Sequence, residues 1–155
     1  MKKTFLLILI FTFTLTKTFA CSCIRTNESL SVKVEKAFTQ ADLIISGTVV
    51  GIKKFKEGKY IFSGNPVIYE FEITKTIKGK IKKEIVEIAS AESGASCGYN
   101  FEIGKSYLVY ARKSNQYSSK TKNESDFVTS LCDRNQKLKK VDKKEFQELE
   151  KLKHR

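Results

Sequence analysis

The sequence VIYEFEITKTI, at residues 67–77, decides the fold of this chain. One face of this segment carries the apolar side chains of Val67, Tyr69, Phe71 and Ile73. The side chains between them are mostly polar, and this period of two residues is typical of a strand that is buried on one face. It is the clearest strand in the chain, and the segments on either side are interpreted around it.

Three further segments are predicted to be strands. Residues 43–52 are rich in β-branched side chains, and Gly47 and Gly51 within them predict a bend or a bulge. Residues 81–89 alternate between apolar and polar side chains again. Residues 107–111 are apolar without interruption, which is typical of a strand buried on both faces.

Two segments outside these strands have helical spacing. Residues 29–40 predict a short amphipathic helix, and the tail at 138–152 carries apolar side chains within an arc of about 140° on a helical wheel. Strands in the middle and helices at the ends do not alternate regularly. The sequence therefore predicts a mainly β fold, a five-stranded and partly open barrel of the oligonucleotide/oligosaccharide-binding shape, with a short amino-terminal helix and a carboxy-terminal amphipathic helix.

The first twenty residues have the layout of a secretory signal peptide. Basic residues at 2–3 precede an apolar run at 5–15 and a small-residue end at 18–20. The run is shorter than the roughly 20 residues of a transmembrane helix. We expect cleavage after Ala20, export from the cell, and one domain over residues 21–155, with its core at 21–133 and no second domain.

The mature chain is basic, but the charge is spread along it. Without the signal peptide it carries 26 Lys and Arg against 17 Asp and Glu, a formal charge of +9. Dispersed lysines favour solubility and attraction to acidic surfaces, and they permit binding of an acidic polysaccharide. Nucleic acid is a poor candidate partner for an exported protein.

Four cysteines, Cys21, Cys23, Cys97 and Cys132, form an even set in a chain that is routed to an oxidising compartment. Two disulfides are therefore expected. A bridge between Cys21 and Cys23 would join near neighbours and strain the bond geometry. Each amino-terminal cysteine should therefore bond to Cys97 or Cys132, which leaves two pairings open.

Four local motifs occur in an order that carries a family resemblance. They are Cys21-Ser22-Cys23, Ala41-Asp42-Leu43-Ile44-Ile45, Ser96-Cys97-Gly98-Tyr99 followed by Tyr107-Leu108-Val109, and Leu131-Cys132-Asp133. Together they resemble the amino-terminal, netrin-like domain of the tissue inhibitors of metalloproteinases. The resemblance covers most of the mature chain and implies a secreted inhibitor of zinc metalloproteases, with no catalysis and no cofactor of its own.

The resemblance also implies the residues of the inhibitory site. It pairs Cys21 with Cys97 and Cys23 with Cys132, and it implies that the amine and carbonyl of Cys21 chelate the catalytic zinc of the target protease. Ser22 would enter a specificity pocket on the primed side of the protease, and Ala95 and Ser96 would line the non-primed side. Such a chelate needs an open zinc position and an amine that loses its proton near neutral pH.

One departure from the family concerns a third cysteine pair that animal members carry in this domain. Thr39 stands where one of those cysteines would be, so the chain resembles a divergent or bacterial-type relative. The region between the first helix and the tail is expected to be less constrained as a result. Target preference does not follow from the resemblance.

Other readings of the same residues remain open. The Cys-Ser-Cys segment could be a plain disulfide anchor, or Cys21 could be lipidated, which would give a periplasmic or outer-surface lipoprotein and is the one case that implies a membrane partner. Lipidation would leave three cysteines, an odd number, and residues 18–20 fit a lipidation signal poorly. A zinc site within the chain is disfavoured because the spacing lacks a Cys-x₂-Cys pair and His154 is the sole histidine.

A binding module is the other alternative to an inhibitor. Aromatic side chains on neighbouring segments could form a stacking platform, although on alternating strands such residues are more often core. The candidate residues are Tyr60, Phe62, Tyr69 and Phe71. Asn27 and Asn123 lie in the acceptor pattern for glycosylation. An enzyme is not predicted, because the sequence lacks a recognisable spacing of a nucleophile and a base.

Overall fold

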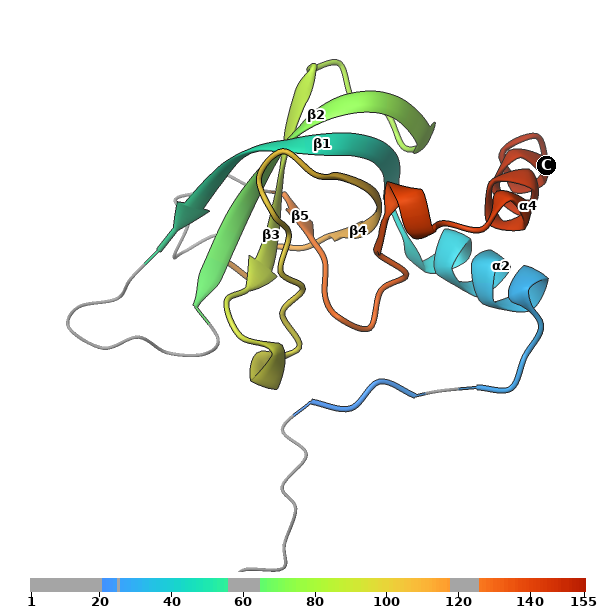
Figure 1. Cartoon of the computed structure of the whole chain (residues 1–155), viewed down its shortest axis with the longest axis horizontal. Coiled ribbons are helices and arrows are strands. Elements are labelled where there is room, and N and C mark those ends of the chain that lie inside the picture. Colours follow the sequence, from blue (N-terminus) through green and yellow to red (C-terminus); the bar gives the residue numbers. More distant parts are fainter. Residues whose placement is uncertain (1–20, 25, 56–64, 118–125) are drawn as a thin grey trace, which may run out of the picture.

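The structure, a computed structural model, describes residues 21–24, 26–55, 65–117 and 126–155 (Figure 1). The predicted signal peptide, Tyr60, Phe62 and Asn123 lie outside these residues. The elements in chain order are α2 (Leu30–Gln40), β1 (Leu43–Lys54), β2 (Pro66–Lys78), β3 (Ile85–Ala91), the 3₁₀ turn η1 (Gly94–Ser96), β4 (Ser106–Lys113), β5 (Phe127–Val128), β6 (Gln136–Lys137), the 3₁₀ turn η2 (Leu138–Lys140) and α4 (Lys143–Lys153).

The strands close into a barrel. Strand β1 pairs antiparallel with both β2 and β4, β2 pairs with β3, and β3 pairs in parallel with β5, which returns to β4. Strand β6 pairs with β4 on the same edge as β5, so these two short strands share the fifth position. The predicted five-stranded barrel is confirmed, although the sequence had located four of its strands.

Strand β1 is long and bent, as its glycines predict. Its register against β2 shifts between Ser46 and Gly47 and again between Val49 and Gly51. A Cβ atom on Gly47 would lie 2.7 Å from the carbonyl oxygen of Glu72, which is too close for any side chain. The bend allows one strand to pair with β2 along its length and with β4 at its start.

The barrel interior is filled by aliphatic and aromatic side chains from every long strand. All five residues from Tyr107 to Ala111 are buried, which confirms that β4 is covered on both faces. Tyr69 and Phe71 are buried too, and the ring of Phe101 lies 5.0 Å from each of theirs. These two aromatic rings therefore belong to the core and do not form a stacking platform.

The two helices pack on the outer face of the barrel, beside each other (Figure 1). Helix α2 begins after Ser29, whose side chain accepts a hydrogen bond from the backbone N–H of Val32. Val34 of α2 and Leu149 of α4 are fully buried in a cluster with residues of β1 and β4. Among the described residues, no helix is long and apolar enough to cross a bilayer.

Two predicted boundaries are wrong. The tail is not one helix over 138–152, because Asp142 interrupts it and caps α4 by accepting a hydrogen bond from the backbone N–H of Lys144. The third strand starts at Ile85 instead of residue 81. Ile81 packs against the barrel core from a loop, so its apolar character reflects anchoring of that loop and not strand alternation.

Candidate functional site

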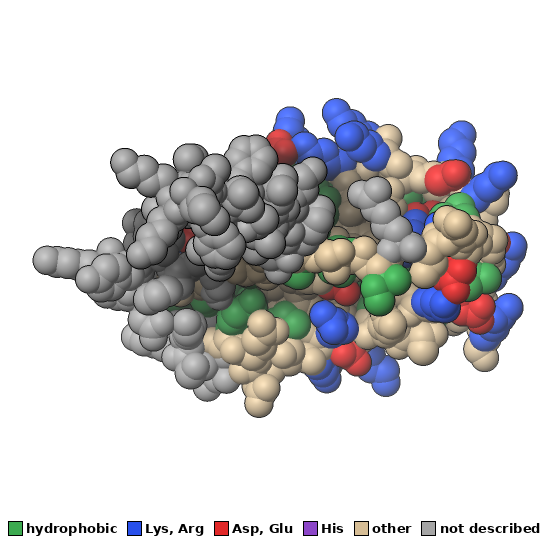
Figure 2. Space-filling view, turned by 90° about the horizontal axis from the view of Figure 1, so that it is seen from below, with side chains coloured by type: hydrophobic (Ala, Val, Ile, Leu, Met, Phe, Trp, Pro, Cys, Tyr) green, Lys and Arg blue, Asp and Glu red, His purple; other side chains and the backbone are tan. Residues whose placement is uncertain are grey.

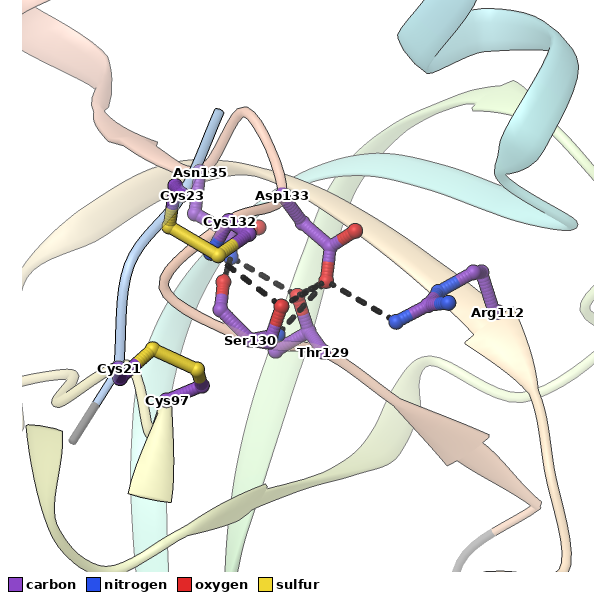
Figure 3. The surroundings of a disulfide bond; sticks show 9 residues. All are labelled: Cys21, Cys23, Cys97, Arg112, Thr129, Ser130, Cys132, Asp133 and Asn135. Carbon is purple, nitrogen blue, oxygen red and sulfur yellow. Dashed lines mark hydrogen bonds and ion pairs between the residues drawn. A yellow bond between two sulfur atoms is a disulfide. The ribbon is translucent and has the colours of Figure 1, made fainter. Parts of the chain in front are cut away.

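The segment Cys21–Cys23 lies across one end of the barrel and is fixed there by two disulfides (Figure 3). Cys21 is bonded to Cys97 with Cα atoms 5.4 Å apart, and Cys23 is bonded to Cys132 with Cα atoms 5.2 Å apart. This is the pairing that the resemblance implies. The two bridges hold both sides of Ser22, whose side chain is exposed.

The loop that carries Cys97 is shaped by local hydrogen bonds. The Ser93 hydroxyl accepts a hydrogen bond from the N–H of Ala95, and the carbonyl of Ser93 accepts one from the N–H of Gly98. A Cβ atom on Gly98 would lie 1.9 Å from the carbonyl oxygen of Ala91, so only glycine fits there. Cys97 itself adopts the left-handed conformation, with φ of 60°.

The loop that carries Cys132 is organised around a carboxylate. Oδ2 of Asp133 accepts hydrogen bonds from the backbone N–H of Ser130 at 2.7 Å and from the Ser130 hydroxyl at 2.8 Å (Figure 3). Arg112 of β4 forms an ion pair with the same oxygen at 3.7 Å. Because one acceptor serves several donors, the loop has little freedom to move Cys132.

Asn135 connects this loop to the barrel wall. Its side chain is buried, and its carbonyl oxygen accepts a hydrogen bond from the N–H of Tyr110 at 3.0 Å. Its amide group donates to the hydroxyl of Thr129 and to the carbonyl of Ser130. The turn that carries Cys132 is therefore hydrogen-bonded to β4 on its inner side.

A direct hydrogen bond joins the two cysteine loops, because the N–H of Leu131 donates to the carbonyl of Cys97 at 2.7 Å. We call the surface formed by residues 21–24, 93–98 and 130–133 the disulfide edge. Ala95 and Ser96 lie on the loop that is bridged to Cys21 through Cys97. Ala95 is exposed on this edge, and Ser96 is half-buried. The structure thus brings together Cys21, Ser22, Cys23, Ala95 and Ser96, all five residues predicted for the site.

The sulfur atoms of Cys21, Cys23 and Cys132 lie within 4.8 Å of one another. Each of these sulfurs is in a disulfide, and the sequence has no unpaired cysteine. Because metal binding by cysteine requires a thiolate, this cluster cannot bind zinc while it is oxidised.

A buried polar network supports the disulfide edge from behind. Glu145 of α4 is 1% exposed, and its carboxylate accepts hydrogen bonds from the Tyr110 hydroxyl at 2.8 Å, from Arg134 at 2.6 and 3.1 Å, and from Gln136 at 2.9 Å. Burial and the neighbouring Glu145 carboxylate raise the pKa of Tyr110 above its usual value. Arg134 lies two residues from Cys132, so this network couples α4 to the cysteine loop.

The sequence analysis did not identify these supporting residues. The sequence does carry a signal for the residues that hold the Cys132 loop. Closely spaced Ser, Thr, Asp and Asn residues, as found around Cys132, are typical of loops held by side-chain hydrogen bonds. Glu145 gave no such signal, since it falls among the charged residues of an amphipathic tail. Its burial depends on tertiary contacts with β4 that the sequence pattern does not encode.

Comparisons with known proteins identify similar sequences. The sequence pattern of the family described as "Tissue inhibitor of metalloproteinase" matches residues 19–151. Metalloproteinase inhibitor 2 of the dog, Canis lupus familiaris, is 33% identical over 119 residues, which are 74% of this chain and 47% of that protein. The human protein of the same name is 32% identical over 119 residues, with the same shares of the two chains.

Metalloproteinase inhibitor 2 of cattle, Bos taurus, is 31% identical over 131 residues, which are 81% of this chain and 52% of that protein. The chain thus spans about half the length of the curated relatives it matches.

The fold and the disulfide edge define a small barrel protein whose amino-terminal segment is fixed across one end of the barrel by disulfides. The chain belongs to the tissue inhibitor of metalloproteinase family. Members of this family are inhibitors and not enzymes, which confirms the prediction that the chain is not an enzyme.

Proposed function

We propose that the mature chain, starting at Cys21, inhibits zinc metalloproteases by chelating the catalytic zinc of the target. The observation that carries this proposal is the pair of disulfides that fix Cys21 and Cys23 against two loops of the barrel. The names of the relatives, metalloproteinase inhibitors, agree with it. The protein needs no cofactor of its own, because the zinc belongs to the protease.

The proposed ligands are the α-amine and the carbonyl oxygen of Cys21, which form a five-membered chelate with a zinc ion that has an open coordination position. Cleavage after Ala20 creates this amine. Its unperturbed pKa of about 7.7–8.0 lies close to neutrality, so little free energy is needed to remove its proton near physiological pH. The Cys21 sulfur stays in its bridge to Cys97 and is not a zinc ligand.

The neighbouring residues would contact the substrate cleft of the protease on both sides of the zinc. Ser22 is exposed between the two bridges, where its small side chain would enter the primed-side pocket and select weakly among targets. Ala95 and Ser96, on the loop bridged to Cys21, would line the non-primed side. The partner is therefore the active-site cleft of a zinc metalloprotease.

Pre-organisation supports tight binding by this segment. Ordering a flexible residue at an interface costs about 1–2 kcal/mol in backbone entropy. Here the disulfides and the hydrogen bonds of Asp133 order the segment during folding. The free energy of contact with the protease is then not spent on ordering the inhibitor.

An extracellular location follows from the same proposal. Disulfides persist in oxidising compartments, and the structure uses all four cysteines in two bridges. A lipidated Cys21 would carry its lipid on sulfur, and that sulfur could not form the bridge to Cys97. The bridged structure therefore favours the unlipidated, secreted form over the membrane-anchored one.

The test compares two versions of the secreted protein against purified catalytic domains of zinc metalloproteases. One version starts at Cys21, and the other retains Ala20 and so replaces the amine with a peptide bond. A version with one alanine added after Arg155 is the matched control, because it changes the length by the same residue far from Cys21. We expect stoichiometric inhibition by the mature form and by the control, and none by the form that retains Ala20.

Equal inhibition by all three forms would exclude zinc chelation by the Cys21 amine. Absence of inhibition by every form, across several protease subfamilies, would exclude the inhibitor function itself. A serine protease in the same assay shows whether any loss of activity is specific to zinc proteases or is a general effect of the added protein.

A further inference from the structure

A second surface lies at the end of the barrel away from the disulfide edge. It is a groove of about 430 Å³, lined by Lys80, Lys82, Lys83 and the apolar side chains of Ile85, Val86 and Phe127, and we call it the lysine groove. The pairing of β3 and β5 shows where it lies. These strands are parallel, and both start at the groove and run toward the disulfide edge.

The two surfaces are well separated. Strand β3 has seven residues from Ile85 to Ala91, and at about 3.3 Å per residue it spans about 20 Å before the chain reaches Ser93 of the disulfide edge. A ligand in the lysine groove therefore does not occupy the disulfide edge.

The three lysines of the groove are held outward by the loop that carries them. Gly79 allows a tight turn after β2 with φ of 92°, and the side chain of Ile81 packs against the barrel core. Lys80, Lys82 and Lys83 on either side of Ile81 are exposed. Within the described residues, none of their ammonium groups forms an ion pair or a hydrogen bond with another side chain.

The lining also contains two carboxylates, Glu87 and Asp126. The charge of Glu87 is offset by Lys53, whose ammonium group lies 2.8 Å from it. Asp126 opposes the three lysines, which leaves the groove with a net positive charge. Because the lysines repel one another and Asp126 offsets one of them, an anionic ligand with several charges gains more here than a single ion.

The floor of the groove limits the chemistry of that ligand. Val86 is buried, whereas Phe127 is half-buried and Ile85 is 47% exposed, so these two side chains give the groove an apolar strip in addition to its cations. Sugar rings present apolar C–H faces between their charged substituents, and they match such a strip. A bilayer is flat and needs an apolar group that reaches outward, whereas this surface is a groove with one partly exposed aliphatic side chain.

We propose that the lysine groove binds a linear polysaccharide that carries sulfate or carboxylate groups. The anionic groups pair with Lys80, Lys82 and Lys83, and the ring faces lie on Ile85 and Phe127. The protein is thereby retained on an acidic matrix while the disulfide edge stays free. This proposal does not depend on protease inhibition, because it concerns a different end of the barrel.

The test measures retention of the mature protein on immobilised heparin and its Kd for a heparin oligosaccharide by calorimetry at about 0.1 M salt, where exposed charges still interact over roughly 10 Å. Two triple variants lose the same charge from different surfaces. The groove variant is Lys80→Gln, Lys82→Gln and Lys83→Gln. The control variant is Lys139→Gln, Lys140→Gln and Lys143→Gln, which are exposed positions of η2 and the start of α4.

The groove variant should bind the oligosaccharide at least tenfold more weakly and elute at lower salt, and the control variant should bind within threefold of the natural protein. Asp126→Asn should shift the Kd the other way, toward tighter binding by twofold to fivefold. The lysines are exposed, and unchanged thermal unfolding of both triple variants verifies that the fold is retained.

Equal weakening of the two triple variants would overturn the proposal, because binding would then follow total charge. Failure of the natural protein to bind heparin would overturn it too. So would binding to phosphatidylserine vesicles that depends on the three groove lysines while heparin binding does not, since the occupant would then be a lipid surface.

Discussion

Removing the bridge between Cys23 and Cys132, by changing both residues to alanine, should lower the free energy of unfolding and raise the inhibition constant. The two effects can be measured separately. The bridge joins residues 109 apart in the sequence. With the bridge from Cys21 to Cys97 intact, however, the shortest covalent path runs back to Cys21 and on from Cys97, through about 37 residues. Chain-entropy theory gives about 4 kcal/mol of folding free energy for a loop of that size.

Inhibition should fall as well, because the variant leaves Ser22 and residue 23 free to move. Ordering two residues costs about 2–4 kcal/mol, which corresponds to an inhibition constant raised roughly 30-fold to 1,000-fold. Leu149→Ala is the matched control. It empties a fully buried site on α4, costs about 2–5 kcal/mol of stability, and is not part of the disulfide edge.

The assay pairs urea unfolding with titration of a zinc metalloprotease at a temperature where both variants are folded. We expect similar losses of stability in the two variants and weaker inhibition in the disulfide variant alone. If the Leu149 variant lost inhibition to the same degree, general destabilisation would explain the effect. Unchanged inhibition by the disulfide variant would show that the bridge does not position the amino terminus.

Two more predictions concern the buried network behind the edge. Glu145→Ala should lower the free energy of unfolding by about 3–5 kcal/mol, because it leaves the Tyr110 hydroxyl and the Arg134 guanidinium without their buried partner; a loss below 1 kcal/mol in urea unfolding would contradict this. The raised pKa of Tyr110 means that its neutral form is favoured in the folded state. The stabilisation of the fold by the neutral Tyr110 hydroxyl is therefore complete below about pH 10 and is lost as the pH rises above it. Tyr110→Phe should therefore show a shallower decline of melting temperature between pH 9 and 11 than the natural protein, and identical slopes would argue against the shift.

The sequence predicted those parts of the fold that depend on periodic burial. The alternation at 67–77, the apolar run at 107–111 and the glycines of the first strand identified β2, β4 and the bends of β1, because each pattern reflects which face is buried. The strands β5 and β6 have two residues each and show no period at all. Their positions are set by pairing with β4, which is a property of the whole barrel.

The residues of the site were predicted in two ways. The spacing of the cysteines excluded a bridge between Cys21 and Cys23 on geometric grounds, and the family resemblance implied the pairing and the inhibitory residues. The residues that hold the loops depend on partners far from them in the sequence. Asp133 forms an ion pair with Arg112, and Asn135 accepts a hydrogen bond from the backbone N–H of Tyr110. Residues that act through such long-range contacts are identified from the structure, in which the strands lie beside one another.

Thr39, which stands where the family resemblance implies one cysteine of a third pair, lies in α2. Thr39 donates its hydroxyl to the carbonyl of Glu35 within α2, and the helices are joined by packing around Val34 and Leu149, both fully buried. Burial of two such aliphatic side chains contributes about 3–6 kcal/mol, comparable to the 2–4 kcal/mol typical of a disulfide. Packing can therefore replace a bridge between two helices.

The disulfide edge offers no such replacement. Ser22, Ala95, Leu131 and Cys132 are all exposed there, and Ile24 is 93% exposed. A segment that must reach into the cleft of another protein cannot bury apolar surface against its own barrel, so hydrophobic packing cannot order it. Covalent bonds and charge-assisted hydrogen bonds order a chain without covering it. This difference explains why both bridges are found at the edge that is proposed to contact the protease, whereas the helices are held together without one.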